Sequence, residues 1–283
     1  MKFAWIDAEK ATRPVTLMCE VFSVSTSGYY AWKAEQRGAE VEEMDLRARI
    51  CTIHKKSRGV YGSPRIHAEL RNMGIRVGRR RRIQIMQEQG LAGRSRLRKV
   101  RTTDSRHTHP VAPNLLEQDF NATEPNKKWV GDVTYLRLPD GWLYLAVLLD
   151  LHSRQVVGWS NSKKVCWFAL KALDQALTTR QPGPGLVHHT DRGSPYASHD
   201  YRERMEEFGM QASMSKAGDC YDNAPAESFF SALKKELGDR FESEAHARRE
   251  LFDYIEVFYN HQRLHSALGM KSPAQFERHQ SAA

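Results

Sequence analysis

Hydrophobic positions in the second half of the chain form short runs that predict strands alternating with helices. β-Branched and aromatic residues mark the strand runs, and apolar positions three and four residues apart mark the helical ones. The predicted strands cover 127–138, 142–150, 155–160, 186–191 and 211–215, and the predicted helices cover 165–179 and 198–208. Three hairpin-linked strands followed by alternating helices and strands predict an α/β fold, with a mixed five-stranded sheet flanked by helices.

The first part of the chain has a helical pattern instead. A short helix, a Ser-rich turn and a second helix from about Ser25 predict a helix-turn-helix-like segment over 14–34. A helical hairpin that packs on a neighbour fits the same pattern. Residues 38–43 predict an acidic connection into a second helical unit. In that unit Ser63 is the predicted N-cap of a helix with Pro64 at its first position, and Gly78 predicts the start of the next helix.

These patterns divide the chain into four predicted parts. They are an N-terminal helical segment (1–43), a basic helical DNA-binding module (44–101), a linker (102–124) and an α/β core with a C-terminal helix (125–283). The linker has no apolar periodicity, so we expect it to be extended.

Charge is distributed unevenly along the chain, whose net charge is +9. Residues 1–110 contain 23 Lys or Arg against 11 Asp or Glu, whereas residues 111–283 contain 20 against 23. A basic front is typical of a protein that binds a polyanion, and an acidic pocket collects divalent cations. The predicted DNA-binding residues of the front are Arg79, Arg80, Arg81, Arg82, Arg94, Arg96, Arg98 and Lys99. The four adjacent arginines wind around a helix and can reach phosphates on several sides, although a solvated charged face has the same pattern.

The cysteines and the hydropathy pattern exclude several classes of protein. None of the four cysteines forms a C-x-x-C pair, which argues against a disulfide framework and a zinc ribbon. No apolar run approaches the ~20 residues that cross a bilayer, and no basic start followed by an apolar stretch indicates a signal peptide. We therefore predict reduced thiols at Cys19, Cys51, Cys166 and Cys220 and a cytoplasmic protein.

Three carboxylates stand where predicted elements end or begin. Asp132 interrupts an otherwise apolar strand, and Asp191 ends a later strand at an edge where ligand sites of α/β sheets gather. Glu227 follows Asp191 with 35 residues between them and opens a helix, for which Asn223 is the predicted N-cap. Lys234 lies about two helical turns beyond Glu227, where it would face DNA.

Such a triad suits metal-dependent phosphoryl transfer. Two divalent ions about 4 Å apart can activate the attacking oxygen and stabilise the leaving oxygen, and Mg²⁺ prefers carboxylate oxygens together with substrate and water. We therefore predict that Asp132, Asp191 and Glu227 are the catalytic residues and the metal ligands. Four other acids compete for this role, but turns, a strand end and a helix cap explain them better: Asp140, Asp150, Asp219 and Asp222.

Several stretches resemble the core signatures of orfB-type transposases. They are Trp129-Val130-Gly131-Asp132-Val133-Thr134-Tyr135, His189-Thr190-Asp191-Arg192-Gly193-Ser194-Pro195-Tyr196, Asn223-Ala224-Pro225-Ala226-Glu227-Ser228-Phe229-Phe230 with Lys234, and a closing motif over 259–269. The chain is similar over nearly its whole length to the insertion-sequence-three family of bacterial mobile elements, relatives of retroviral integrases. The resemblance implies a ribonuclease-H-like integrase core that cleaves a strand at an element end and transfers the 3′ hydroxyl to another phosphodiester, in DNA transposition, recombination and integration.

The resemblance also implies cofactors and partners. Two Mg²⁺ ions per active site are implied, with Mn²⁺ as a possible substitute. The implied partners are DNA, as inverted-repeat ends and target, further copies of the chain, and a protein from an upstream reading frame joined by frameshifting. Three auxiliary residues have both a substrate role and a structural role open to them: His189, Asn223 and Arg263.

Two other functions fit the same residues. One is a plain ribonuclease-H-like nuclease, which normally has a fourth active-site carboxylate. The other is a catalytically silent DNA-binding regulator, against which the intact triad weighs. The apolar spacing over 245–267 predicts a terminal helix that packs in the core.

Overall fold

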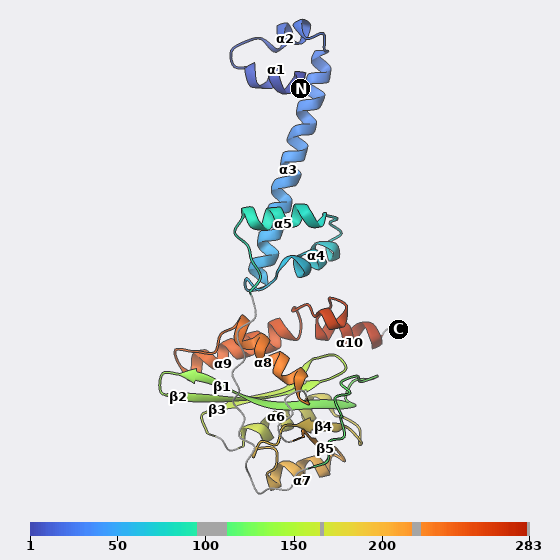
Figure 1. The fold of residues 1–283 in the computed structure, drawn as a ribbon, viewed down its shortest axis with the longest axis vertical. Coiled ribbons are helices and arrows are strands. Elements are labelled where there is room, and N and C mark those ends of the chain that lie inside the picture. Colours follow the sequence, from blue (N-terminus) through green and yellow to red (C-terminus); the bar gives the residue numbers. More distant parts are fainter. Residues whose placement is uncertain (95–111, 165–166, 217–221, 282–283) are drawn as a thin grey trace. The chain divides into compact units, whose positions relative to one another are not determined.

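The computed structural model describes residues 1–94, 112–164, 167–216 and 222–281. The chain forms two compact units, unit 1 over Met1–Ala92 and unit 2 over Gly93–Ala283 (Figure 1). Among the described helices, none combines the length and the apolar character that crossing a membrane requires.

Unit 1, all of whose residues are described, consists of helices and their connections. The helices are α1 (Lys2–Glu9), α2 (Val15–Val21), α3 (Thr26–Lys56), α4 (Ser63–Asn72) and α5 (Arg79–Glu88). The predicted helix start near Ser25 is confirmed, because the Ser25 side chain accepts a hydrogen bond from the backbone N–H of Gly28 and caps α3. A small core joins α1, α2 and α3 through Ile6, Met18, Cys19 and Tyr29.

Two local predictions for unit 1 are wrong. The acidic connection expected over 38–43 does not exist, because α3 runs through these residues without a break. The alanine and glutamate residues there are good helix formers, which offset the weak preference of the one glycine. Ser63 is not the N-cap of α4, since Gly62 holds that position. The Ser63 hydroxyl instead accepts a hydrogen bond of 2.9 Å from Nε of Arg82.

The described residues of unit 2 form one sheet with the strand order β3-β2-β1-β4-β5. Its strands are β1 (Lys128–Leu138), β2 (Gly141–Asp150), β3 (Val156–Ser162), β4 (Val187–Thr190) and β5 (Gln211–Met214). The hairpin-linked strands β1, β2 and β3 pair antiparallel, whereas β4 pairs in parallel with both β1 and β5. The predicted mixed five-stranded α/β fold is confirmed.

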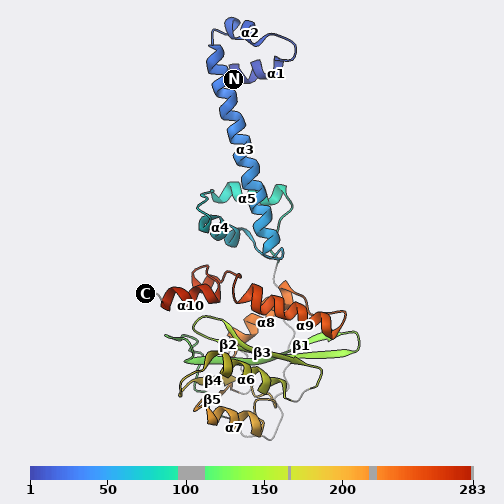
Figure 2. The ribbon, with the colours of Figure 1, turned by 180° about the vertical axis from the view of Figure 1, so that it is seen from behind.

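Helices cover both faces of this sheet (Figures 1 and 2). On one face lie α6 (Phe168–Arg180) and α7 (His199–Glu207), and on the other lie α8 (Ala224–Glu236) and α9 (Glu244–Phe252). The main core fills the space between the sheet and the pair α6 and α7, with Trp129, Leu148, Leu173 and Tyr201 among its buried members. Strand β1 lies at the centre of the sheet, between β2 and β4.

The terminal helix is shorter than predicted. After α9 the backbone continues as a π-helix, η1 (Asp253–Tyr259), and the helix ends at Asn260. The side chain of Asn260 donates to the carbonyl oxygen of Val156 and accepts from its N–H, both at 3.0 Å, which fixes the chain against β3. A 3-10 turn η2 (Ser266–Leu268) and helix α10 (Pro273–Ser281) follow. The apolar positions expected in the core are buried, as predicted: Leu251, Tyr254, Ile255 and Phe258.

Candidate active site

Strand pairing places Asp132 and Asp191 side by side. β1 and β4 are parallel neighbours, and Gly131 lies opposite Thr190. Asp132 follows Gly131 within β1, and Asp191 follows Thr190 directly after β4. A Cβ on Gly131 would lie 2.9 Å from Cε1 of His188 and 3.2 Å from Cγ2 of Thr190, so only glycine allows this close approach of the two strands.

Helix α8 contributes Glu227 from its first turn. Asn223 precedes this helix, but its side chain does not cap it. Nδ2 of Asn223 instead donates a hydrogen bond of 3.2 Å to the carbonyl oxygen of Gly131. Asn223 therefore occupies the predicted N-cap position, but its side chain makes no capping hydrogen bond. Asn223 ties the start of the helix that holds Glu227 to the backbone beside Asp132.

The three carboxylates interact electrostatically. Burial raises the pKa of Asp132 well above its usual range, and the charges of Asp191 and Glu227 raise it further. The N–H of Val133, which donates to Oδ1 of Asp132 at 2.8 Å, and the charge of Lys234 both act in the opposite direction. Negative charge crowded in this way favours a bound cation.

The turn after β4 orients Asp191. The N–H of Gly193 donates a hydrogen bond of 2.9 Å to Oδ1 of Asp191. A Cβ on Gly193 would lie 2.8 Å from the same oxygen, so a larger residue would displace the carboxylate. Nε of Arg192 donates to the carbonyl oxygen of Ser215 at 2.8 Å and fixes the turn against the end of β5.

Lys234 lies on the same uninterrupted helix as Glu227, as the helical spacing predicted. Burial lowers the pKa of Lys234, and the charges of Asp239 and Asp132 raise it. The ammonium is therefore within electrostatic reach of Asp132. It adds a positive charge close to a site that otherwise carries carboxylates.

The donor set of the triad fits Mg²⁺, which prefers carboxylate oxygens. A different group of potential metal ligands lies on α7. Among the described residues, the potential ligand atoms of His199, Asp200 and Glu203 all lie within 4.8 Å of one another. All three are exposed, and exposed acidic groups of this kind are common without an ion. The triad is not among the groups of described residues whose potential ligand atoms all lie within 4.8 Å of one another.

The auxiliary His189 is part of the core. Its Nδ1 lies 2.8 Å from Oγ of Ser213 and its Nε2 lies 3.1 Å from Oγ of Ser215. Burial lowers the pKa of His189 to about 4, so the imidazole is neutral near pH 7. Its neighbour His188 is equally buried, with Nε2 2.7 Å from the hydroxyl of Tyr201. Both rings hold β4 in place.

Arg263 does not reach the surface where DNA would bind. Its Nε and Nη2 donate to the two carboxylate oxygens of Glu236 at 2.8 and 2.7 Å, and the side chain is only 8% exposed. The hydroxyl of Tyr254 donates to the same carboxylate at 2.8 Å. The structure therefore contradicts the substrate role left open for Arg263, because the buried charge of Glu236 requires this guanidinium.

The predicted DNA-binding residues of the basic front have different environments. Arg79 and Arg80 are exposed, whereas Arg81 forms a two-point ion pair with Glu43 of α3. Arg82 is buried against α4, so its predicted contact with DNA is wrong. In unit 2, Nη1 of Arg94 donates to the carbonyl oxygens of Lys235 and Glu236 at 3.0 Å and caps the end of α8. The remaining three lie outside the described residues: Arg96, Arg98 and Lys99.

The competing acids have structural partners. Asp140 pairs with Lys163 at 2.7 Å, and Asp150 accepts hydrogen bonds from the N–H groups of Asn126 and His152. Asp222 accepts from the N–H of Lys216 and from two side-chain amides, those of Asn114 and Gln118. Asp219 lies outside the described residues, as do Cys166 and Cys220, while Cys19 and Cys51 are free thiols.

Known protein families match both parts of the chain. Integrase core domain models match residues 122–220 and 208–273, and an HTH-like domain model matches residues 40–99. The chain is 43% identical over 272 residues to an uncharacterized 31 kDa protein of insertion element IS600 from Shigella sonnei, covering 94% of this chain and 100% of that protein. It is 40% identical over 285 residues to the transposase InsF of insertion sequence IS3A from Escherichia coli, covering 98% of each.

These matches define a polynucleotidyl transferase with an integrase core and a helix-turn-helix-like domain. The chain belongs to the insertion-sequence-three (IS3) family of transposases, whose activities are transposition and DNA integration. A solved intasome of simian T-cell lymphotropic virus in complex with the PP2A regulatory subunit B56 gamma is also similar, with a TM-score of 0.47 and 16% identity over 81% of this chain and 74% of that chain. The family assignment rests on the sequence relatives alone.

Proposed function

We propose that the chain cleaves a DNA strand at insertion-sequence ends and transfers the freed 3′ hydroxyl to another phosphodiester, with Asp132, Asp191 and Glu227 holding two Mg²⁺ ions. One observation carries this proposal: the register of β1 and β4 sets Asp132 beside Asp191, and the charge of Glu227 acts on Asp132. Bound ions would supply activation of the attacking oxygen and stabilisation of the leaving oxygen. Mn²⁺ accepts the same oxygen ligands and is proposed as a substitute.

The protein residues have separate tasks in this reaction. The central strand β1 and the turn after β4 hold the first two carboxylates in place, and the Asn223 tether holds the start of α8 against β1. Lys234 would bind the phosphate backbone of the DNA beside the carboxylates, since an ammonium is a point charge suited to phosphate.

The proposed partners follow from this activity. They are DNA, as insertion-sequence inverted-repeat ends and as target, and further copies of the chain, because two ends must be joined together. The upstream-frame partner protein is proposed from the family resemblance alone. We propose that the chain works in the cytoplasm, bound to the nucleoid.

A cleavage and joining assay tests the proposal. The full chain is incubated with labelled duplexes that carry the element end, with Mg²⁺ or with a chelator. We expect cleavage and joined products with the wild type in Mg²⁺, and a loss on the order of a thousand-fold for Asp132→Asn, because several kcal/mol of transition-state stabilisation disappear. Duplex binding should be retained.

Each alternative function has its own outcome in this assay. Cleavage without joined products would indicate a plain nuclease. Binding without cleavage by the wild type would indicate a regulator. Activity of Asp132→Asn near the wild-type level would remove Asp132 from the site.

A further inference from the structure

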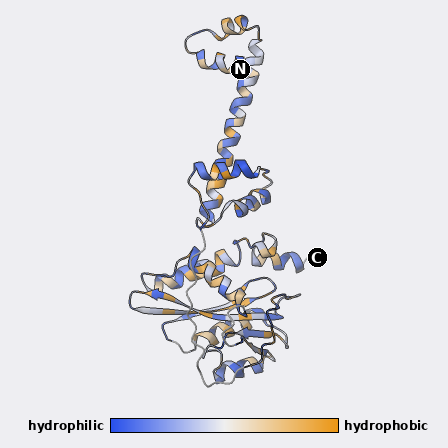
Figure 3. Cartoon of the chain, in the orientation of Figure 1, coloured by the Kyte–Doolittle hydropathy of each residue, from blue (hydrophilic) through white to orange (hydrophobic). Residues whose placement is uncertain are grey.

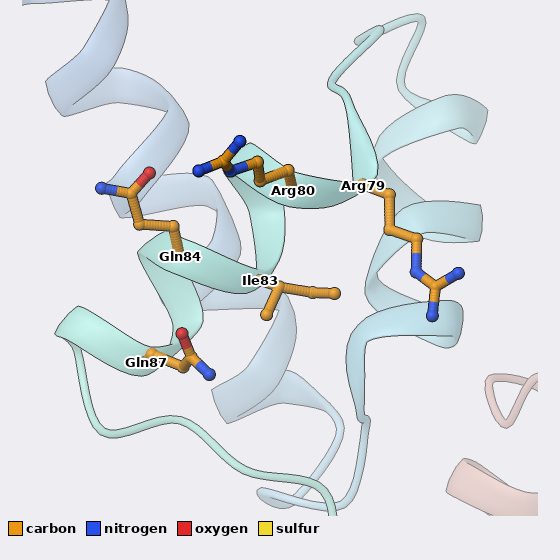
Figure 4. A pocket seen from close by; sticks show the side chains of 5 residues that line it. All are labelled: Arg79, Arg80, Ile83, Gln84 and Gln87. Carbon is orange, nitrogen blue, oxygen red and sulfur yellow. The ribbon is translucent and has the colours of Figure 1, made fainter.

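Helix α5 has one face that packs in unit 1 and one that does not. Arg82, Ile85 and Met86 are buried, and they lie on one side of the helix. On the opposite side, an open depression of about 610 Å³ is lined by Arg79, Arg80, Ile83, Gln84 and Gln87 (Figure 4). Figure 3 shows α5 as a strongly hydrophilic segment. The exposed face therefore has a composition unlike that of a packing surface.

The helical geometry explains why these five side chains act together. At about 100° per residue they occupy an arc of roughly 140°, and they extend along about 12 Å of the helix axis. Figure 4 shows Arg80 and Gln84 projecting to one side of this face and Arg79 and Ile83 to the other. Gln84 also donates a hydrogen bond of 2.7 Å to Glu88 one turn further along.

The neighbouring arginines have other tasks. Arg81 is engaged by Glu43 and Arg82 by Ser63, so the run of four arginines contributes only its first two members to the exposed face. The anchored pair holds α5 against α3 and α4 and gives the exposed face a fixed orientation within unit 1.

We propose that this face of α5 reads base edges in the major groove of DNA. Guanidinium groups match the two acceptors of guanine, amide groups match the acceptor and donor of adenine, and an aliphatic side chain contacts the methyl group of thymine. Arg79 and Arg80 would therefore bind guanine and Gln84 and Gln87 adenine, while Ile83 lies between them. This inference rests on the proposed function, and it assigns the preference of the protein for particular DNA sequences to these residues.

The chemistry of the face favours DNA over a protein partner. None of the five lining side chains is acidic, two carry a positive charge, and the apolar part is a single isoleucine. The diameter of a helix with its side chains, about 10–12 Å, matches the width of the major groove, about 12 Å. The N-terminal end of the helix carries both arginines, and in helix-turn-helix proteins this end contacts bases.

Selection from random-sequence duplexes tests the proposal. The full chain is bound to a pool of random duplexes, and the retained DNA is sequenced. We expect the wild type to enrich a short motif. The double variant Gln84→Ala, Gln87→Ala should lose the preference at one or two positions by roughly ten-fold, because each amide-adenine pair contributes discrimination of that order. The affinity for duplexes without the motif should not change, since neither glutamine is charged.

A charge-conserving change separates base reading from phosphate binding. Arg80→Lys keeps the charge but loses the planar guanidinium, which can donate two parallel hydrogen bonds to guanine. The motif should therefore lose a guanine, while the dependence of affinity on salt stays the same. The matched controls Gln36→Ala and Arg71→Lys change exposed residues elsewhere in unit 1 and should keep the full motif. Circular dichroism of each variant checks that unit 1 is folded.

Three results would overturn the proposal: no motif with the wild type, the same motif with the double variant, or an equal loss in the controls. Failure of the proposed function is separable from this one. A chain that keeps its α5-dependent motif but neither cleaves nor joins DNA would contradict only the transposase reaction, and joining without such a motif would contradict only the base-reading face.

Discussion

The two units arrange charged residues in opposite ways. In unit 2, parallel pairing of β1 and β4 sets Asp132 beside Asp191, although they are far apart in sequence. In unit 1, four consecutive arginines separate around α5, and only Arg79 and Arg80 remain exposed while Arg82 is buried. Consecutive helical residues differ by about 100° in direction, whereas strand register sets distant residues side by side. Side chains that act together must therefore point in the same direction, and adjacent positions in the sequence do not ensure this.

Removing the arginine of an ion pair should lower the free energy of unfolding much more in unit 2 than in unit 1. Arg263→Ala leaves the buried charge of Glu236 uncompensated and should lower the free energy of unfolding by about 3–5 kcal/mol. Arg81→Ala removes a comparable pair with Glu43 that is about one-third exposed, so it should cost less than about 1 kcal/mol. Urea unfolding, followed for each unit, measures both. Equal losses would contradict the structural difference between the two pairs.

A substitution that pushes β1 away from β4 should displace Asp132 relative to Asp191. Gly131→Ala places a methyl group against His188 and Thr190 and should cost about 1–3 kcal/mol of stability, with a matching loss of strand joining. Gly183→Ala is the matched control, because nothing lies within 4 Å of its added Cβ. Thermal unfolding and joining yields of the two variants are compared. A fully active Gly131→Ala variant would show that the close approach is dispensable.

Acid should weaken unit 2 through its buried histidines. Burial lowers the pKa of His188 from 6.5 to about 3, so the unfolded chain takes up the proton first as the pH falls. The stabilisation is fully present above pH 6.5 and is lost toward pH 3, by about 1.4 kcal/mol per pH unit for this residue. His188→Gln, which cannot titrate, should show a shallower pH dependence of the unfolding free energy. A slope equal to that of the wild type would contradict the neutral, buried state of His188.

The smallest effect is expected for a lysine near the end of α8. Lys234 acts on Asp132, whereas Lys235 is rotated about 100° around the helix. Lys234→Ala should reduce the slope of log affinity against log salt by about 0.9, the value for one phosphate contact, and lower joining several-fold. Lys235→Ala should leave both quantities near the wild-type values. An equal change in the two variants would remove Lys234 from the DNA path.

Local signals predicted most of the fold. The β-branched runs and the turn at Pro139 and Asp140 predict the strands, and the start of α8 follows from residues near Glu227. Features set by distant partners were not predictable. Asn223 is the N-cap of α8, as its neighbours predict, but its side chain donates to β1 and not to the helix. The ion pair of Arg81 with Glu43 depends on how α5 packs on α3. The three carboxylates of the proposed triad could be named from the sequence, while the interaction between their charges depends on the sheet register.

Binding of Mn²⁺ to the full chain, followed by electron paramagnetic resonance, tests the triad assignment most directly. Asp132→Asn removes a carboxylate with almost no change in volume, and His199→Ala removes a ligand of the exposed group on α7. The triad assignment predicts that the tightest Mn²⁺ binding weakens at least about ten-fold in Asp132→Asn and is unchanged in His199→Ala. Unchanged binding in Asp132→Asn, or a loss confined to His199→Ala, would contradict it.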